Sequence, residues 1–145
     1  MDISTELEKA INEQIGIEFS ASYAYLSMAA YFERNAFDGF SKWMHLQSEE
    51  EHMHAMKFYQ YLIDRGGVAP IPSIPAPEFN FDSVIKVFEA SLDQEREVTR
   101  HIYDLYKIAQ NESDFATVSF LKWFVDEQVE EEKNVSDMID KLKMA

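Results

Sequence analysis

Glu-His-Met-His at positions 51–54 and Gln-Val-Glu-Glu at 128–131 decide the fold of this 145-residue chain. Each stretch puts two potential metal ligands three residues apart, and therefore on one face of a helix. Glu18 and Glu95 are acidic residues on the apolar faces of two further helical stretches. A carboxylate that faces a dry core is costly unless something pairs with it. The four stretches together predict helices whose acidic groups converge on a cation.

Apolar side chains recur at steps of three and four in four long stretches, which predicts four helices. The predicted helices cover residues about 5–34, 39–65, 82–110 and 115–143. Thr5, Asp38 and Asp82 are the expected N-terminal caps, and the pair Gly66-Gly67 is expected to end the second helix. No stretch shows sustained alternation at period two, so we predict no β-sheet.

All four prolines fall between Pro70 and Pro77, so the segment 68–80 is predicted to be extended. At roughly 3.3 Å per residue the segment reaches about 40 Å. A helix of about 27 residues has the same length at about 1.5 Å per residue. The short, long and short connections therefore predict an all-α fold, an antiparallel four-helix bundle with one long crossover between helices two and three, in one domain spanning 1–145.

The composition narrows the function classes. A formal net charge of −14 opposes binding to nucleic acid or anionic membranes and attracts cations, although acidity alone also serves solubility. The chain has no cysteine, which excludes a thiolate metal site. No apolar run approaches the roughly 20 residues that span a bilayer, and residues 1–4 lack the start of a signal peptide. A cytoplasmic location is expected.

The polar members of the four apolar faces lie near the middle of their helices. Midpoints of antiparallel helices of similar length lie at the same height, so these side chains are expected to meet. The set comprises Glu18, Glu51, His54, Glu95, Gln128 and Glu131. Carboxylates with one imidazole suit iron, manganese or zinc better than copper(I). Single glutamates on two helices with Glu-x-x-His on another follow the plan of di-iron carboxylate proteins.

Over essentially its whole length the chain resembles the non-haem ferritins, the prokaryotic ones in particular. The matching stretches are Asn12-Glu13-Gln14 with Glu18 and Tyr25, Glu50-Glu51 with His54, Glu95, and the run 120–132. The resemblance implies a ferroxidase centre in which Glu18, Glu51 and His54 hold a first iron. Glu51 would bridge to a second iron held by Glu95, with Gln128 beside it to help place O₂ or a bridging oxygen.

The same resemblance implies further features. A third iron site would use the acidic residues Glu50, Glu127, Glu130 and Glu131, with Glu131 leaning toward either the second or the third iron. Tyr25 would lie beside the centre and supply an electron during oxidation. Bacterioferritins place a haem-ligating methionine directly after the bridging glutamate, and the residue there is His52, so no haem is expected. Ferritins usually continue into a short fifth helix, whereas this sequence ends at Ala145.

The predicted function is therefore iron storage and detoxification by a ferroxidase. Fe(II) is expected to be oxidised by O₂ or hydrogen peroxide and mineralised in a homo-oligomeric shell, of 24 subunits if typical of the family. Three alternatives stay open: another di-iron oxygenase, a ferroxidase that forms no closed shell, and a metal-free helical interaction module. The oxygenases are usually longer chains, and the module would leave several carboxylates buried at a cost.

Overall fold

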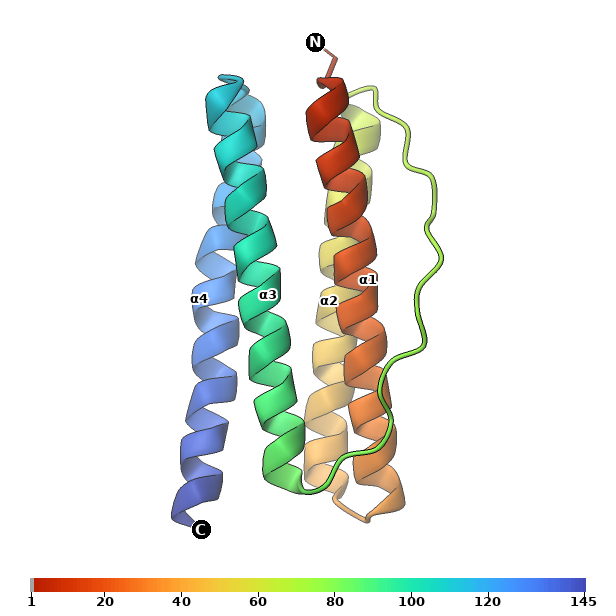
Figure 1. Cartoon of the computed structure of the whole chain (residues 1–145), viewed down its shortest axis with the longest axis vertical. Helices are drawn as coiled ribbons and strands as arrows, with labels where there is room; N and C mark the ends of the chain where they lie inside the picture. Colours follow the sequence, from red (N-terminus) through yellow and green to blue (C-terminus); the bar gives the residue numbers. More distant parts are fainter. Residues whose placement is uncertain (1) are drawn as a thin grey trace. The chain divides into compact units, whose positions relative to one another are not determined.

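The computed structural model of this chain describes residues 2–145, and Met1 lies outside the described residues. Its helices are α1 (Thr5–Arg34), α2 (Asp38–Asp64), α3 (Val84–Asn111) and α4 (Phe115–Met144) (Figure 1). Every observed bound lies within two residues of its prediction, and residues 2–145 contain no strand, so the predicted all-α class is confirmed. The chain divides into two compact units, Met1–Asn80 and Phe81–Ala145.

The first unit is a pair of antiparallel helices, α1 and α2. At one end the Ile3 amide donates to the Arg65 carbonyl oxygen at 3.4 Å, and at the other the helices are joined by the short loop 35–37. Halfway along, the hydroxyl groups of Ser22 and Ser48 each donate to the other residue's carbonyl oxygen at 2.8 Å. These contacts fix the register of the two helices along their whole length.

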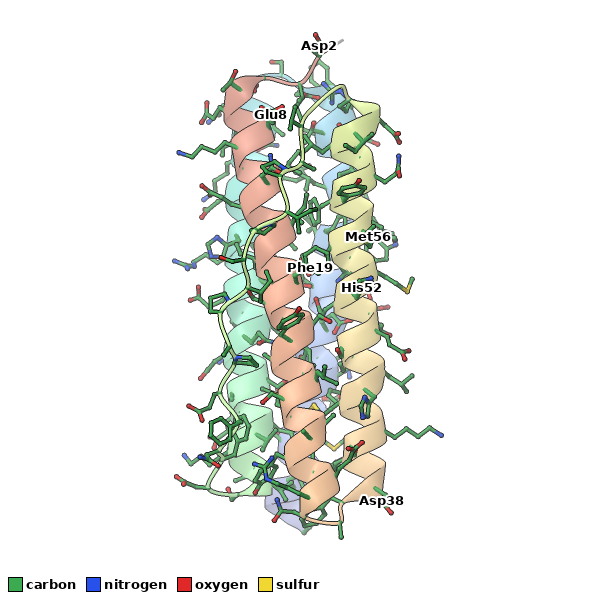
Figure 2. All side chains as sticks on the ribbon, turned by 90° about the vertical axis from the view of Figure 1, so that its right-hand side faces the viewer. Asp2, Glu8, Phe19, Asp38, His52 and Met56 are labelled. Carbon is green, nitrogen blue, oxygen red and sulfur yellow. The ribbon has the colours of Figure 1, made fainter. Side chains whose placement is uncertain are left out.

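The extended segment after α2 runs back along α1, as Figures 1 and 2 show. Three α1 side chains hold the segment by donating to its backbone carbonyl oxygens. The pairs are Asn12 with Val68 at 2.9 Å, Ser27 with Glu78 at 2.6 Å, and Arg34 with Phe79 at 2.6 Å. The predicted extended course of residues 68–80 is therefore confirmed, and its proline-rich backbone finds partners along α1.

The second unit contains α3 and α4, which are joined by a tight turn at 112–114. The Asp114 side chain accepts a hydrogen bond from the Thr117 amide at 3.0 Å and so caps α4. Phe88 and Phe124 are the largest of the fully buried side chains in this unit. None of the helices within residues 2–145 combines the length and apolar character needed to cross a bilayer.

Three predicted helix caps are wrong by one residue. Ser4 caps α1 in place of Thr5, Ser83 caps α3 in place of Asp82, and Phe37 precedes α2 without a side-chain hydrogen bond to it. Adjacent residues able to cap a helix compete, and the one with extended backbone wins, as Ser4 does at φ −67° and ψ 157°. Asp38 instead lies in the first turn, where its charge favours the helix dipole.

Gly66 should be hard to replace, because its φ of +79° lies in the left-handed region after the end of α2. We expect Gly66→Ala to lower the free energy of unfolding by about 1 kcal/mol. Gly39→Ala is the control, since Gly39 is helical and no atom outside its immediate neighbourhood comes within 4 Å of an added Cβ. Denaturant unfolding at fixed chain concentration should show a lower free energy of unfolding for Gly66→Ala and no loss for Gly39→Ala. Equal changes in the two variants would contradict the need for glycine at position 66.

Candidate metal centre

The first unit brings together three of the predicted ligands. Glu18 from α1 meets Glu51 and His54 from α2, and each offers one ligand atom within 4.8 Å of the other two. Their exposed fractions are 0%, 0% and 3%, respectively. Because Glu51 and His54 are three residues apart on one helix, both side chains reach the same side of α2. The side chains of Glu18, Glu51 and His54 therefore form a buried cluster of two carboxylates and one imidazole.

The distances within this cluster fit a shared cation. The Nδ1 atom of His54 lies 3.3 Å from Glu51 Oε2 and 3.6 Å from Glu18 Oε2. Metal bonds of about 2.0 to 2.2 Å to nitrogen and oxygen put neighbouring donor atoms roughly 3.0 to 3.4 Å apart. Within residues 2–145, Glu18 Oε2 accepts no hydrogen bond. An imidazole nitrogen and two hard oxygens at this spacing suit Fe(II) or Zn(II).

Gln14 positions the Glu18 carboxylate. Gln14 lies one helical turn before Glu18 on α1 and is 1% exposed. Its Nε2 atom donates a hydrogen bond to Glu18 Oε1 at 3.1 Å. One oxygen of Glu18 is thus held by an amide, while the other faces His54. From the sequence, Gln14 is named only within a stretch that matches the family and is given no task. The available signal was its spacing of four residues from a buried carboxylate.

The second unit holds Glu95 on α3 and Gln128 on α4 close together. Gln128 Nε2 lies 3.2 Å from the Glu95 backbone carbonyl oxygen and 3.5 Å from Glu95 Oε1. Glu95 is 0% exposed and Gln128 is 1% exposed. Glu131 is also buried, three residues after Gln128 on the same helix. This unit therefore carries two buried carboxylates and an amide.

Two residues that sequence reasoning did not select complete this arrangement. The Thr99 hydroxyl accepts a hydrogen bond from Gln128 Nε2 at 3.0 Å and lies 2.6 Å from Glu132 Oε2. Thr99 follows Glu95 by four residues, and Glu132 follows Gln128 by four. The same one-turn spacing that links Gln14 to Glu18 was the signal that could have found them.

The remaining predicted residues differ in exposure. Glu50 and Glu130 are exposed, and Glu127 is half-buried. Tyr25 is fully buried on α1, and its ring lies edge-on to the half-buried Trp43, with the ring centroids 6.5 Å apart. A third iron site and electron supply by Tyr25 stay predictions.

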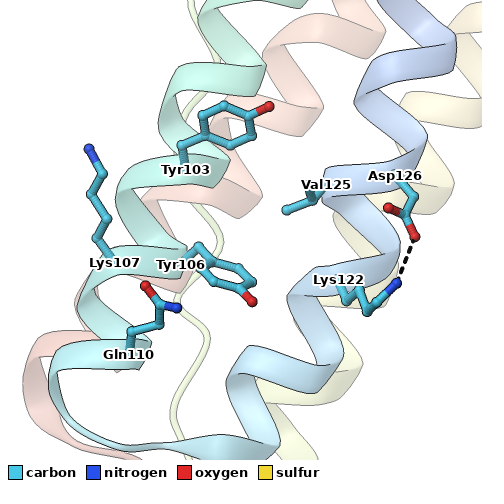
Figure 3. A pocket seen from close by; sticks show the side chains of 7 residues that line it. All are labelled: Tyr103, Tyr106, Lys107, Gln110, Lys122, Val125 and Asp126. Carbon is cyan, nitrogen blue, oxygen red and sulfur yellow. Dashed lines mark hydrogen bonds and ion pairs between the residues drawn. The ribbon is translucent and has the colours of Figure 1, made fainter.

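A separate groove of about 410 Å³ lies between α3 and α4. Figure 3 shows Tyr103 and Tyr106 reaching from α3 toward α4, while Lys122 turns to Asp126 at 3.3 Å. Asp126 is the only carboxylate among the residues that line this groove. Since that carboxylate is paired with a lysine, the groove lacks the donor set of a metal site.

The ferritin family model, described as a ferritin-like domain, matches residues 8–145. A bacterial non-heme ferritin of Staphylococcus epidermidis is 46% identical over 140 residues, covering 97% of this chain and 84% of that protein. A bacterial non-heme ferritin of Staphylococcus aureus is 45% identical over 130 residues, covering 90% of this chain and 78% of that protein.

Solved structures agree with the sequence relatives. An open pore ferritin from the hyperthermophilic archaeon Archaeoglobus fulgidus aligns with a TM-score of 0.97 at 42% identity, covering 98% of this chain and 87% of that one. A Chlorobium tepidum ferritin aligns with a TM-score of 0.94 at 32% identity, covering 97% and 86%. The predicted ferritin-like fold is confirmed, and the chain belongs to the ferritin family.

Glu18 should lower the free energy of unfolding of the metal-free protein. The reason is that its carboxylate is buried and one of its two oxygens has no hydrogen bond within residues 2–145. We expect Glu18→Gln to raise the free energy of unfolding of the metal-free protein by about 1 kcal/mol or more. Zn(II) should then stabilise the wild type far more than the variant. Denaturant unfolding with and without Zn(II) measures both effects.

The matched control is Glu13→Gln, which removes an exposed carboxylate from the same helix. It should leave the free energy of unfolding within about 0.5 kcal/mol. A metal-free Glu18→Gln protein less stable than the wild type would argue that Glu18 is a structural group rather than a ligand.

Proposed function

We propose that this chain is an iron-storing ferroxidase, which oxidises Fe(II) with O₂ or hydrogen peroxide and keeps the ferric product as a mineral. The buried cluster of Glu18, Glu51 and His54 carries this proposal, because its donor atoms have the spacing of a cation site. Membership of the ferritin family supports it independently. Fe(II) is the substrate of the site, and ferric oxyhydroxide is the stored product.

We further propose that the two units form one domain and that their ligands serve one di-iron centre. Two findings support this: the family match spans both units, and the polar residues of all four helices lie near the helix midpoints. Glu18 and His54 would hold the first iron, and Glu51 would bridge to the second. Glu95 would hold the second iron, with Gln128 and Glu131 beside it.

The charge of this ligand set favours oxidation. Glu18, Glu51, Glu95 and Glu131 together carry four negative charges, which balance two Fe(II) ions. When each iron loses one electron, one O₂ takes up both electrons and two protons and becomes hydrogen peroxide. The two Fe(III) ions then carry two positive charges more than the carboxylates, so they attract hydroxide or oxide from water. The site thus stabilises the oxidised state while promoting the hydrolysis that begins a mineral.

The remaining acidic residues would form a third iron site. Glu50, Glu127 and Glu130 would make this site together with Glu131. The exposure of Glu50 and Glu130 to solvent suits a point of transfer between the centre and solution. Tyr25 would supply an electron when the two irons alone do not complete the reduction of the oxidant. The residue after Glu51 is His52, so we propose that the chain works without haem.

Assembly into a homo-oligomer is part of the proposal, with 24 subunits as the expected number. The first unit exposes large apolar side chains on both helices, which favours burial against another copy. They are Tyr23, Leu26, Leu46, Met53 and Met56, and Figure 2 shows the face that carries Met56. We propose the cytoplasm as the location, with no nucleic acid or membrane as partner.

Fe(II) oxidation by the metal-free protein in air tests the function. The wild type should oxidise Fe(II) much faster than buffer and retain many iron atoms per chain in a large particle. A di-iron oxygenase would stop near two iron atoms per chain, and a metal-free interaction module would not exceed the rate in buffer. Absorbance of the ferric product, iron analysis and particle mass give the three readouts.

His54→Ala should slow the initial oxidation by about tenfold or more, because it removes the imidazole from the first iron. His52→Ala is the matched control, since His52 is an exposed histidine on the same helix and should leave the rate nearly unchanged. Equal rates for the two variants would refute the proposed role of His54.

A further inference from the structure

Thr99 joins the amide of Gln128 to the carboxylate of Glu132. Gln128 Nε2 donates to Thr99 Oγ1 at 3.0 Å, and Thr99 Oγ1 lies 2.6 Å from Glu132 Oε2. The Thr99 hydroxyl also lies 2.9 Å from the Glu95 backbone carbonyl oxygen. All four residues belong to α3 and α4 of the second unit. The mechanism outlined above uses Gln128 and Glu95 but gives Thr99 and Glu132 no part.

The direction of this chain of hydrogen bonds follows from its lengths and charges. The Thr99 hydroxyl has one proton and two candidate acceptors, Glu132 Oε2 and the Glu95 carbonyl oxygen. The distance to Glu132 Oε2 is the shorter of the two, and a carboxylate is a stronger acceptor than a carbonyl oxygen. The Thr99 hydroxyl therefore donates its proton to Glu132 Oε2. A hydroxyl that donates to a carboxylate becomes a better acceptor, which strengthens the bond from Gln128.

This arrangement determines which end of the Gln128 amide is available for chemistry. The nitrogen is engaged by Thr99, by the Glu95 carbonyl oxygen at 3.2 Å and, at the longer distance of 3.5 Å, by Glu95 Oε1. A reversed amide would put its own oxygen against that carbonyl oxygen, where neither atom can donate, and both would lose a hydrogen bond. The nitrogen therefore stays on this side, and the Gln128 oxygen Oε1 is turned away from it.

We propose that Thr99 and Glu132 are positioning residues that lock the Gln128 amide, so that Gln128 serves the reaction through its oxygen, as a hard donor to Fe(II). This inference rests on the proposed function for the role of Gln128, and on the distances above for the lock itself. Oxygen ligands suit Fe(II), whereas an amide N–H cannot bind a cation. The lock excludes a role in which Gln128 donates a hydrogen bond to O₂.

Glu132 is suited to this task because it is partly exposed. Its side chain is 32% exposed, and its nearest ion-pair partner, Arg96, lies 4.0 Å away. The carboxylate is therefore partly hydrated, while the Thr99 hydroxyl links it to the buried Gln128 amide. Thr99 is also β-branched, which restricts its χ1 angle and fixes the hydroxyl on the helix.

Crystal structures of the iron-free protein test the lock directly. In the wild type and in Thr99→Ser, the Gln128 nitrogen should face the Glu95 carbonyl oxygen and the hydroxyl. In Thr99→Val, which keeps the shape and removes the hydroxyl, the amide should rotate or occupy two orientations. An unchanged Gln128 amide in Thr99→Val would overturn the proposal, whatever the iron chemistry.

Initial rates of Fe(II) oxidation test whether the orientation of the Gln128 amide matters for the reaction. Thr99→Val should be slower by about tenfold and Thr99→Ser within about twofold of the wild type. When Gln128 is first replaced by leucine, Thr99→Val should have no further effect, because its action passes through Gln128. A similar loss in both backgrounds would overturn the proposal.

Two further variants complete the design. Thr117→Val makes the same replacement on α4 about 16 Å along the helix from Gln128, and should leave the rate within about twofold of the wild type. Glu132→Ala changes a half-exposed residue and therefore serves as the second variant if Thr99→Val fails to fold. It should slow Fe(II) oxidation by about threefold or more. A wild-type rate for Glu132→Ala would overturn its part in the lock.

Failure of the inference and failure of the proposed function are distinguishable. A wild type that does not oxidise Fe(II) would refute the ferroxidase, while the iron-free crystal structures would still decide whether Thr99 locks the amide. An active wild type with a rotated amide and an unchanged rate in Thr99→Val would keep the ferroxidase and refute the role of the Gln128 oxygen.

Discussion

The approach of His54 Nδ1 to the Glu18 and Glu51 carboxylates, at 3.6 and 3.3 Å, is the constraint on which the rest of this structure depends. A charged group removed from water costs several kcal/mol unless an opposite charge compensates for it. Neither carboxylate is exposed. The apolar faces of α1 and α2 thus carry an energetic penalty near their middle, which a bound cation would offset. We expect stability and function to be linked at this point, because the same groups would destabilise the metal-free protein and bind the metal.

Helical geometry supplies the positioning. The two proposed ligands from α2 are three residues apart. Three supporting pairs are four residues apart: Gln14 with Glu18, Glu95 with Thr99, and Gln128 with Glu132. Residues at these spacings are neighbours on a helix surface. Each unit therefore builds its part of the site mostly from contacts within a helix and with its adjacent antiparallel partner. Long helices keep these side chains at fixed heights without requiring irregular backbone.

Much of the fold could be predicted from the sequence, for identifiable reasons. Steps of three and four residues gave the helix bounds within two residues, and the proline cluster gave the extended crossover. The caps were missed by one residue because Ser4 and Thr5, like Asp82 and Ser83, are neighbours that can both cap a helix. Backbone dihedral angles decide between them, and the sequence does not contain those angles.

The candidate metal ligands are easier to find in the sequence than the groups that support them. A glutamate on an apolar face is conspicuous, whereas a glutamine or threonine in a helix is usually a surface group. The roles of Gln14 and Thr99 depend on hydrogen-bond distances, and periodicity reports only which face a residue occupies. For the same reason, a run of three glutamates such as 130–132 does not reveal that Glu132 contacts Thr99.

Anomalous X-ray scattering at the iron edge, from crystals soaked anaerobically in Fe(II), tests the central claim most directly. The account predicts a strong peak at bonding distance from Glu18, Glu51 and His54. Iron found elsewhere on the protein, with no peak beside these three residues, would contradict it.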